Sequence, residues 1–402
     1  MRKETPDMTK NEAIPSLLPV YKRIDLVFDH GEGAWLFTRD GRKFLDFASG
    51  IAVTGLGHAH PHLVKVLHEQ IDHVWHVSNL FRIDHLERLA DRLVANSFAE
   101  TVFVCNSGAE AMEACIKMAR RFHWARGQAG RHRIITFQGS FHGRTMATIS
   151  AAGENRLTEG FAPLLDGFDQ VPFADHQMVR DAITDQTAAI MIEPVQGEGG
   201  IRPVPQECLK GLRQLCDEHD ILLIFDEVQC GMGRTGKLFA HQVAGVSPDI
   251  MGSAKGLGGG FPIGACLATA RAASGMTTST HGSTFGGNPL ATAAANAVLD
   301  IMLADGFLDG VVERGRYLRE RLESVVSAHP DVLEGIRGEG LMLGMKCVVP
   351  HLEFNARLRE NGLLSVPAAD NIVRLLPPLI ITDEETDIAV GIIEETCRSM
   401  KS

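Results

Sequence analysis

Short apolar runs recur between residues 101 and 252, and stretches with helical periodicity separate them. The runs are Thr101–Cys105, Arg133–Phe137, Ala188–Ile192, Ile221–Phe225 and Ile250–Gly252. Most of their residues are apolar in succession, which is typical of strands that are covered on both faces. The pattern therefore predicts an α/β fold in which helices cover both sides of a mostly parallel central sheet.

The segments on either side of this region have different patterns. Residues 25–47 alternate apolar and polar side chains around an Asp-Gly turn, which predicts a short antiparallel meander. Helical spacing recurs over residues 61–97 and 288–304. After residue 305 we expect a smaller α+β unit with helices at 311–328 and 383–400 and strands at 341–345 and 372–376.

This organisation predicts three parts along the chain. We expect residues 61–304 to form a large cofactor-binding domain and residues 305–402 to form a small C-terminal domain. The N-terminal segment, residues 1–60, is expected to join the small domain.

Composition excludes several classes of function. The net charge is −11, and non-specific nucleic-acid binding requires a basic surface. No apolar run approaches the roughly 20 residues of a membrane span, and the first residues lack the apolar core of a signal peptide. Eight scattered cysteines without a CxxC pair are typical of thiols in a reducing compartment. We therefore expect a cytoplasmic protein that binds neither nucleic acid nor membranes.

Two motifs invite other interpretations. His58, His60 and His62 occupy alternate positions, but no cysteine or carboxylate cluster with zinc spacing supports a metal site. Residues 231–237 match the phosphate-binding pattern GxxxxGK, but Leu238 stands where Ser or Thr would hold magnesium. We expect no bound metal, and a nucleotide hydrolase is the alternative from another enzyme class.

Asp226 and Lys255 give the strongest functional signal. Asp226 follows a buried apolar run, where a carboxylate is costly unless it meets a cation or strong donors. Lys255 lies among small residues, which leave room for a flat molecule against it. Pyridoxal phosphate fits both features, because its aldehyde forms a Schiff base with a lysine and its protonated ring nitrogen pairs with a carboxylate. Desolvation would lower the pKa of Lys255 and make its amine a nucleophile.

Further polar residues follow the other runs. Ser107, Gly108 and Ala109 open a helix, whose free N–H groups can bind a phosphate, although an ordinary N-cap serine is the alternative. Phe141 could stack on a cofactor ring. Arg144 could hold a substrate carboxylate with two parallel hydrogen bonds, and a solvated surface arginine is the alternative.

The residues near the last strands complete this list. Glu193 ends one run and could join the hydrogen bonds around the ring. Glu198 lies in a glycine-rich loop, where it could pair with an active-site arginine and release it for another substrate. Val228 could pack on the ring face, and Gln229 could bond the phenolic oxygen of the ring.

These strings together resemble the class III, fold-type I pyridoxal-phosphate aminotransferases from about residue 20 to the C-terminus. The most specific part is residues 221–265, with an aspartate at a strand end, Gly-Arg-Thr-Gly, Ser-Pro-Asp and Lys-Gly-Leu-Gly-Gly-Gly-Phe-Pro-Ile-Gly-Ala. The resemblance implies pyridoxal 5′-phosphate as cofactor and a homodimer with shared active sites.

The resemblance adds roles for individual residues. It implies that Lys255 carries the cofactor, that Arg374 takes the substrate α-carboxylate, and that Thr284 binds the phosphate from the neighbouring subunit. With the reading of the residues themselves, it gives as cofactor-binding Ser107, Gly108, Ala109, Phe141, Glu193, Asp226, Val228, Gln229, Lys255 and Thr284. The expected substrate-binding residues are Arg144, Glu198, Ser283 and Arg374.

The expected reaction moves the terminal amino group of N-acetylornithine to 2-oxoglutarate, giving N-acetylglutamate 5-semialdehyde and glutamate, as in arginine biosynthesis. Members of the class that act on free ornithine hold its charged α-amine with tyrosines near the site. Residues 51–55 contain no tyrosine, and the chain has only Tyr21 and Tyr317. An acylated donor is therefore favoured, and succinylornithine, succinyldiaminopimelate, ornithine and 4-aminobutyrate are the alternatives.

Overall fold

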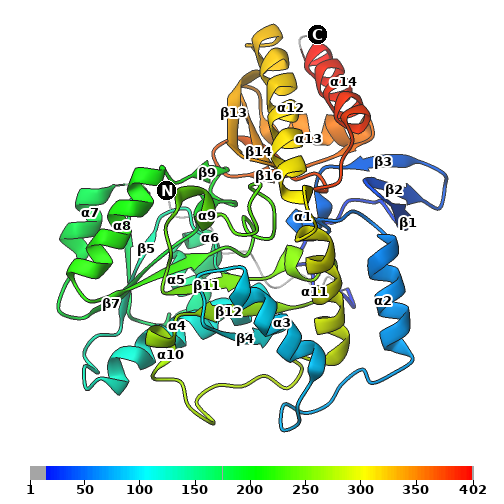
Figure 1. Ribbon diagram of the computed structural model, residues 1–402. Coiled ribbons are helices and arrows are strands. Elements are labelled where there is room, and N and C mark those ends of the chain that lie inside the picture. The colour runs from blue at the N-terminus through cyan, green and yellow to red at the C-terminus, as the bar shows by residue number, and fades with distance from the viewer. Residues whose placement is uncertain (1–14, 174, 401–402) are drawn as a thin grey trace.

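The computed structural model describes residues 15–173 and 175–400, and its largest element is a seven-stranded sheet (Figure 1). Its strands run in the order β4 (Thr101–Cys105), β12 (Gly264–Ala268), β11 (Ile250–Ser253), β10 (Leu222–Asp226), β7 (Thr187–Ile192), β5 (Arg133–Phe137) and β6 (Phe168–Val171). The last five are parallel to one another, and β12 runs antiparallel to both of its neighbours. The predicted mostly parallel sheet is confirmed, with β6 and β12 as strands that the sequence analysis did not anticipate.

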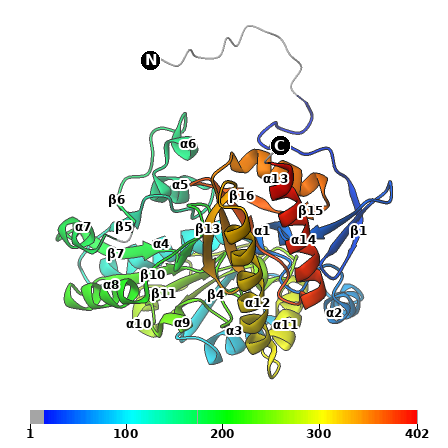
Figure 2. The same ribbon diagram turned by 90° about the horizontal axis from the view of Figure 1, so that it is seen from above.

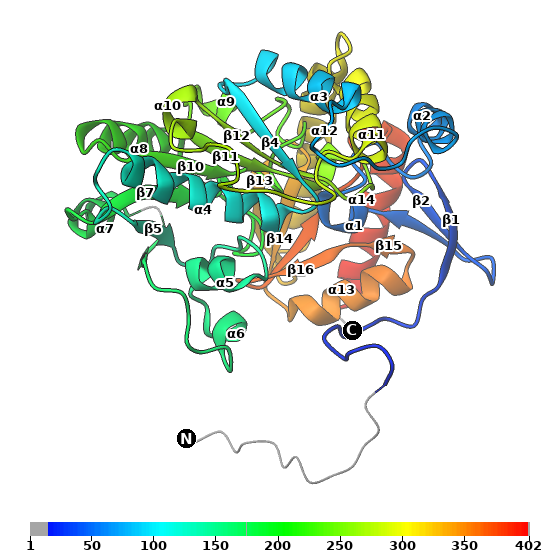
Figure 3. The ribbon, with the colours of Figure 1, turned by 90° about the horizontal axis from the view of Figure 1, so that it is seen from below.

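The continuous apolar runs arise because both faces of this sheet are covered. In β10, Leu222 and Ile224 belong to one buried cluster with the helix α4 (Gly108–Ala125), while Leu223 and Phe225 belong to another that includes α8 (Gln206–Glu218). Figure 3 shows α4 crossing one face of the sheet. Burying each such side chain contributes about 1.5–3 kcal/mol, so alternation with polar residues would be strongly unfavourable here.

The C-terminal part contains a separate four-stranded antiparallel sheet. Its order is β13 (Leu333–Glu339), β14 (Met342–Cys347), β17 (Ile372–Leu375) and β16 (Val366–Ala368). The helices α12 (Phe307–Ala328), α13 (His351–Glu360) and α14 (Asp383–Ser399) accompany it at the top of Figure 1. The helix predicted from residue 311 begins earlier, at Phe307. Its N-cap is Gly306, whose φ of +78° is outside the helical region and so sets the start of the helix.

The predicted N-terminal meander consists of β1 (Phe28–Glu32), β2 (Trp35–Thr38) and β3 (Lys43–Asp46). The short strand β15 (Leu363–Leu364) pairs in parallel with β3, and the indole N–H of Trp35 donates to Glu385 Oε1 of α14 at 2.9 Å. Figure 2 shows β1 and β15 on the same side as α14. The N-terminal meander and the C-terminal part of the chain are therefore joined by both backbone and side-chain hydrogen bonds.

Helices α2 (Pro61–Ile71), α3 (Asp84–Ala95) and α11 (Pro289–Met302) pack together beside the large sheet. No single helix in residues 15–173 and 175–400 is long and apolar enough to cross a membrane, and α11 and α12 meet the length and composition criteria only as a pair bent by 73°. The remaining elements are α1 (Ser49–Ala52), α5 (Met146–Ala152), α6 (Asn155–Thr158), α7 (His176–Ala182), α9 (His241–Ala244), α10 (Ala270–Ala273), a 3-10 turn (Lys255–Leu257), β8 (Val195–Gln196) and β9 (Arg202–Pro203).

Candidate active site

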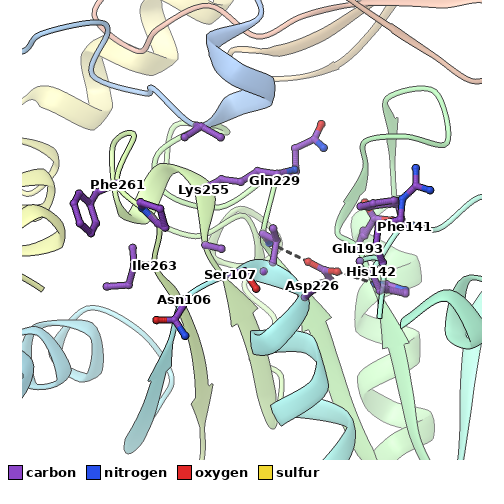
Figure 4. Close-up of a pocket in the computed structure, with 18 of the residues that line it drawn as sticks. Asn106, Ser107, Phe141, His142, Glu193, Asp226, Gln229, Lys255, Phe261 and Ile263 are labelled. Carbon is purple, nitrogen blue, oxygen red and sulfur yellow. Dashed lines mark hydrogen bonds and ion pairs between the residues drawn. The ribbon is translucent and has the colours of Figure 1, made fainter. Parts of the chain in front are cut away.

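A cavity of about 430 Å³ lies beyond the carboxyl ends of the large sheet (Figure 4). Parallel α/β sheets bind ligands at this edge, and the volume is within the range of cofactor sites. Most of the residues predicted at the site line it: Ser107, Gly108, Ala109, Phe141, Arg144, Glu193, Asp226, Val228, Gln229 and Lys255. The predicted residues among them, which are up to 148 residues apart in the chain (255 − 107), are thus brought to one cavity.

Lys255 follows β11 and begins the 3-10 turn, with a φ of +45°. A non-glycine residue in this left-handed region is strained and persists only where its surroundings fix it, which is common at functional sites. Burial lowers the pKa of the Lys255 amine, and the positive charge of Arg374 lowers it further. The neutral amine, which is the nucleophilic form, is therefore favoured relative to a solvated lysine.

Asp226 ends β10 and is held by two donors. Its Oδ2 lies 2.7 Å from Nδ1 of His142, and its Oδ1 accepts the Val228 N–H at 3.0 Å. Both side chains are buried. Burial acts to lower the pKa of His142, but its hydrogen bond to Asp226 and the charges of Asp226 and Glu193 outweigh burial and raise it. His142 and the Val228 N–H thus hold the Asp226 carboxyl in place at the end of β10.

His142 was not predicted as a site residue. It lies next to Phe141, in the loop after β5. Phe141 and Arg144 were predicted because they follow that strand, and the same argument could have found His142. Its Nε2 is buried and has no hydrogen-bond partner within residues 15–173 and 175–400. The cavity is also lined by eight residues that were not predicted as site residues: Val53, Asn106, Gly143, Ala254, Gly260, Phe261, Pro262 and Ile263.

Glu193 joins two loops of the cavity. Its Oε1 accepts the N–H of Phe141 at 2.9 Å, and its Oε2 accepts the N–H of Gly197 at 3.1 Å. Burial, followed by the negative charge of Asp226, raises the pKa of Glu193 to about 7. This carboxyl therefore connects the loop that carries Phe141 with the loop that carries Glu198.

The N-terminus of α4 faces the cavity. Ser107 is its N-cap, and the serine hydroxyl accepts the Glu110 N–H at 3.2 Å. At Gly108 there is no room for a side chain, because a Cβ would lie 2.7 Å from Cγ1 of Val228. The dipole and free N–H groups at the start of this 18-residue helix favour a bound anion.

These features together fit pyridoxal phosphate. A helix N-terminus suits its phosphate, a buried carboxylate supported by a histidine suits its ring nitrogen, and a lysine amine of lowered pKa suits its aldehyde. Val228 and Phe141, both lining residues, can pack against a flat ring.

Arg374 lies on β17, fully buried behind the cavity lining. Its Nη1 lies 2.7 Å from Glu198 Oε1 and donates to Gln229 Oε1 at 3.1 Å, and its Nη2 donates to the carbonyl of Pro367 at 3.1 Å. The sequence predicted that Glu198 pairs with an active-site arginine, and the structure brings Glu198 and Arg374 into contact.

The remaining predicted residues lie at the rim of the cavity or outside its lining. Arg144 is exposed at the cavity rim, with its guanidinium 5.5 Å from the centre of the Phe141 ring. The Ser283 hydroxyl accepts the Asn106 Nδ2–H at 2.9 Å and does not line the cavity. Thr284 is exposed and also lies outside the lining. This chain alone therefore does not bring Ser283 and Thr284 into the cavity.

The two rejected motifs have structural partners of their own. His58 lies 2.8 Å from Asp46 and His62 lies 2.9 Å from Asp300, and the described ranges contain no group of three or more potential metal ligands. In the loop of residues 231–237, the fully buried Arg234 donates to the carbonyls of Leu341 and Pro377. That loop thus contacts the C-terminal part of the chain.

The model of the aminotransferase class-III family matches residues 19–397. The chain belongs to the class III aminotransferases. It is therefore a pyridoxal-phosphate-dependent transaminase of fold type I, as the motifs at Asp226 and Lys255 had indicated.

Individual relatives of this class III aminotransferase cover nearly all of it. It is 57% identical to the acetylornithine aminotransferase of Mesorhizobium japonicum over 385 residues, which is 96% of each chain. The crystal structure of N-acetylornithine aminotransferase from Stenotrophomonas maltophilia is 39% identical, with a TM-score of 0.83, and covers 95% of this chain and 98% of that one. The ornithine aminotransferase of Toxoplasma gondii is 30% identical, with a TM-score of 0.92, and covers 96% and 93%.

Proposed function

We propose that this enzyme transfers the terminal amino group of N-acetylornithine to 2-oxoglutarate and so serves arginine biosynthesis. The relatives at 51–57% identity carry the name acetylornithine aminotransferase. The fold does not discriminate between donors, because an ornithine aminotransferase superimposes with a TM-score of 0.92. The choice therefore rests on the relatives and on the residues at the cavity.

The observation that carries this choice is the lining of the cavity next to residues 51–55. Val53 lines the cavity there, and neither tyrosine of the chain does. Tyr21 is 74% exposed, and the Tyr317 hydroxyl donates to Asp387 between α12 and α14. A free α-ammonium would require polar partners, while an N-acetyl group tolerates an apolar wall. An acylated donor therefore fits this cavity better than free ornithine.

Lys255 is the proposed catalytic residue. Bound pyridoxal phosphate would take up the amino group of the donor and pass it to the oxo acid. The buried amine of Lys255 would move the proton between the substrate carbon and the cofactor carbon, as general base and then general acid. Asp226, held by His142, would keep the ring nitrogen protonated.

Two arginines are proposed to bind the acceptor, which is a dicarboxylate. Arg144 at the rim would hold one carboxylate, and Arg374 would hold the other. With the monocarboxylate donor bound, Glu198 would stay on Arg374 and neutralise it. With 2-oxoglutarate bound, Glu198 would release Arg374.

We also propose a cytoplasmic homodimer with shared active sites. Thr284 is exposed on a loop before α11 and would bind the cofactor phosphate of the neighbouring subunit, and Ser283 beside it would contact the substrate. Seven of the eight cysteines are buried, which accords with a reducing compartment. Within each subunit, residues 61–304 would form the large domain, and residues 1–60 would join residues 305–402 in the small one. The pairing of β3 with β15 supports this assignment, and residues 1–14, 174 and 401–402 lie outside the described residues.

Steady-state rates on N-acetylornithine, succinylornithine, ornithine and 4-aminobutyrate, measured side by side with 2-oxoglutarate, test the donor. We expect kcat/KM to be highest for N-acetylornithine and at least about 100-fold lower for ornithine, because its ammonium would lack partners. A higher kcat/KM for ornithine would refute the donor assignment. Lys255→Ala should abolish transamination of every donor in the panel.

A further inference from the structure

Arg374 has two acceptors on the same nitrogen, and they differ in character. Nη1 reaches the carboxylate of Glu198 at 2.7 Å and the amide oxygen of Gln229 at 3.1 Å. The Glu198 side chain is 23% exposed, while Gln229 as a residue is only 7% exposed. One partner can therefore turn toward solvent, and the other is enclosed.

The backbone around Glu198 is fixed even though its side chain is accessible. The Glu198 carbonyl accepts the Ala369 N–H at 3.0 Å, and a Cβ on Gly200 would lie 2.9 Å from the Ala369 carbonyl oxygen. On the other side, the Gly197 N–H is held by Glu193. Glu198 can therefore leave Arg374 by side-chain rotation, without movement of its loop.

When Glu198 leaves, the guanidinium retains two neutral acceptors, the amide of Gln229 and the carbonyl of Pro367. Neutral acceptors fix the orientation of the arginine without cancelling its charge, which stays available to an incoming carboxylate. Nε of Arg374 is buried and has no hydrogen-bond partner among the described residues, so it adds no hydrogen bond to those at Nη1 and Nη2. Figure 4 shows Gln229 beside Lys255 in the cavity. Gln229 therefore lies between the cavity and Arg374, which it contacts from the lining.

We propose that Gln229 is a positioning residue that holds Arg374 in place for the dicarboxylate acceptor while Glu198 is turned away. The inference rests on the proposed function of Arg374. It adds Gln229 as a residue that favours binding of the dicarboxylate acceptor over binding of the amino donor. The contact with Arg374 also fixes the orientation of the Gln229 amide, because Oε1 faces Arg374. The Nε2 group would then remain to donate to bound cofactor.

The test compares Gln229→Met and Gln229→Glu with the parent enzyme, all loaded with cofactor. Glutarate, a five-carbon dicarboxylate that cannot react, is titrated by calorimetry. Gln229→Met removes the acceptor, and Gln229→Glu keeps an acceptor but neutralises Arg374, so each should weaken glutarate binding at least about tenfold. KM for 2-oxoglutarate should rise several-fold more than KM for N-acetylornithine. The control is Gln177→Met on the exposed face of α7, which should bind glutarate like the parent.

If both Gln229 variants bind glutarate within twofold of the parent, the inference is wrong. Equal increases in both KM values would likewise overturn it, because they would assign Gln229 to the cofactor alone. Glutarate binding does not depend on the identity of the amino donor. A failure of the donor assignment is therefore distinguishable from a failure of this inference.

Discussion

At the scale of single residues, burial decides the chemistry of the site. The pKa of Lys255 is lowered because its amine is desolvated and because Arg374 is positively charged, whereas Asp226 is held by a histidine and a backbone N–H. Glu193 is fully enclosed, and its pKa of about 7 follows from desolvation and from the charge of Asp226. The site thus contains an acid that titrates near neutral pH.

This gives a prediction for stability against pH in cofactor-free protein. The folded pKa of Glu193, about 7, exceeds its ordinary value of 4.5, so the folded state binds a proton that the unfolded state has lost in that window. The stabilising contribution is therefore present below pH 4.5 and is lost as pH rises through 7. Between pH 5 and 7, the Glu193 carboxyl should make the free energy of unfolding fall by about 1 kcal/mol per pH unit. Glu193→Gln should remove this part of the pH dependence. Urea unfolding across this range measures it, and an unchanged slope would contradict the assignment.

At the scale of elements, the start of α4 is a closely packed part of the site. Ser107 caps the helix, and Gly108 leaves the space that Val228 fills. Gly108 therefore belongs to two parts of the site. It begins the helix whose N-terminus would bind the phosphate, and it leaves room for Val228, which would pack on the cofactor ring.

Gly108→Ala tests this junction. The new Cβ would meet Cγ1 of the stiff, β-branched Val228 at 2.7 Å, so we expect a loss of about 1–3 kcal/mol in stability. Displacement of Val228 and the helix N-terminus should also weaken cofactor binding by about tenfold or more. Thermal unfolding and cofactor titration measure the two effects. Gly130→Ala, where a Cβ would meet nothing within 4 Å, is the matched control and should change neither.

At the scale of the whole molecule, an exposed apolar surface lies next to the loop of Thr284. It comprises Trp75, Leu80, Phe81 and Phe285, which are 59–88% exposed. The Asn79 side chain donates to the carbonyls of Ser283 and Gly286, and the rings of His76 and Phe285 are 5.2 Å apart. Such a patch is typical of a subunit interface, and it would carry Thr284 to the neighbouring site.

The double variant Leu80→Glu, Phe81→Glu should convert the proposed dimer into a monomer, because two carboxylates would be buried without partners at the interface. Transamination should fall at least about tenfold, since each cavity would lose its second-subunit phosphate contact. Sedimentation and activity at equal concentration measure this. Leu352→Glu, at a leucine of α13 that is 63% exposed, should leave the mass unchanged. A dimeric double variant would rule out this interface.

Several features of the protein followed from the sequence alone. The apolar runs at β4, β5, β7, β10 and β11 predicted a sheet buried on both faces, and the residues just after them predicted the site. Local chemistry sufficed there because strand pattern, helix capping and the Asp226 and Lys255 motifs are written in consecutive residues. The strand β12 escaped prediction because its small residues resemble the glycine-rich loop before it.

Only the tertiary structure decided which distant residues meet. His142 became part of the site through its contact with Asp226, and Gln229 and Glu198 share the guanidinium of Arg374, which lies 145 residues beyond Gln229. The pKa of Glu193 likewise depends on burial and on a carboxylate from another strand. Contacts between segments and desolvation are properties of the packed chain, since they arise only when the sheet edges and the C-terminal unit enclose the cavity.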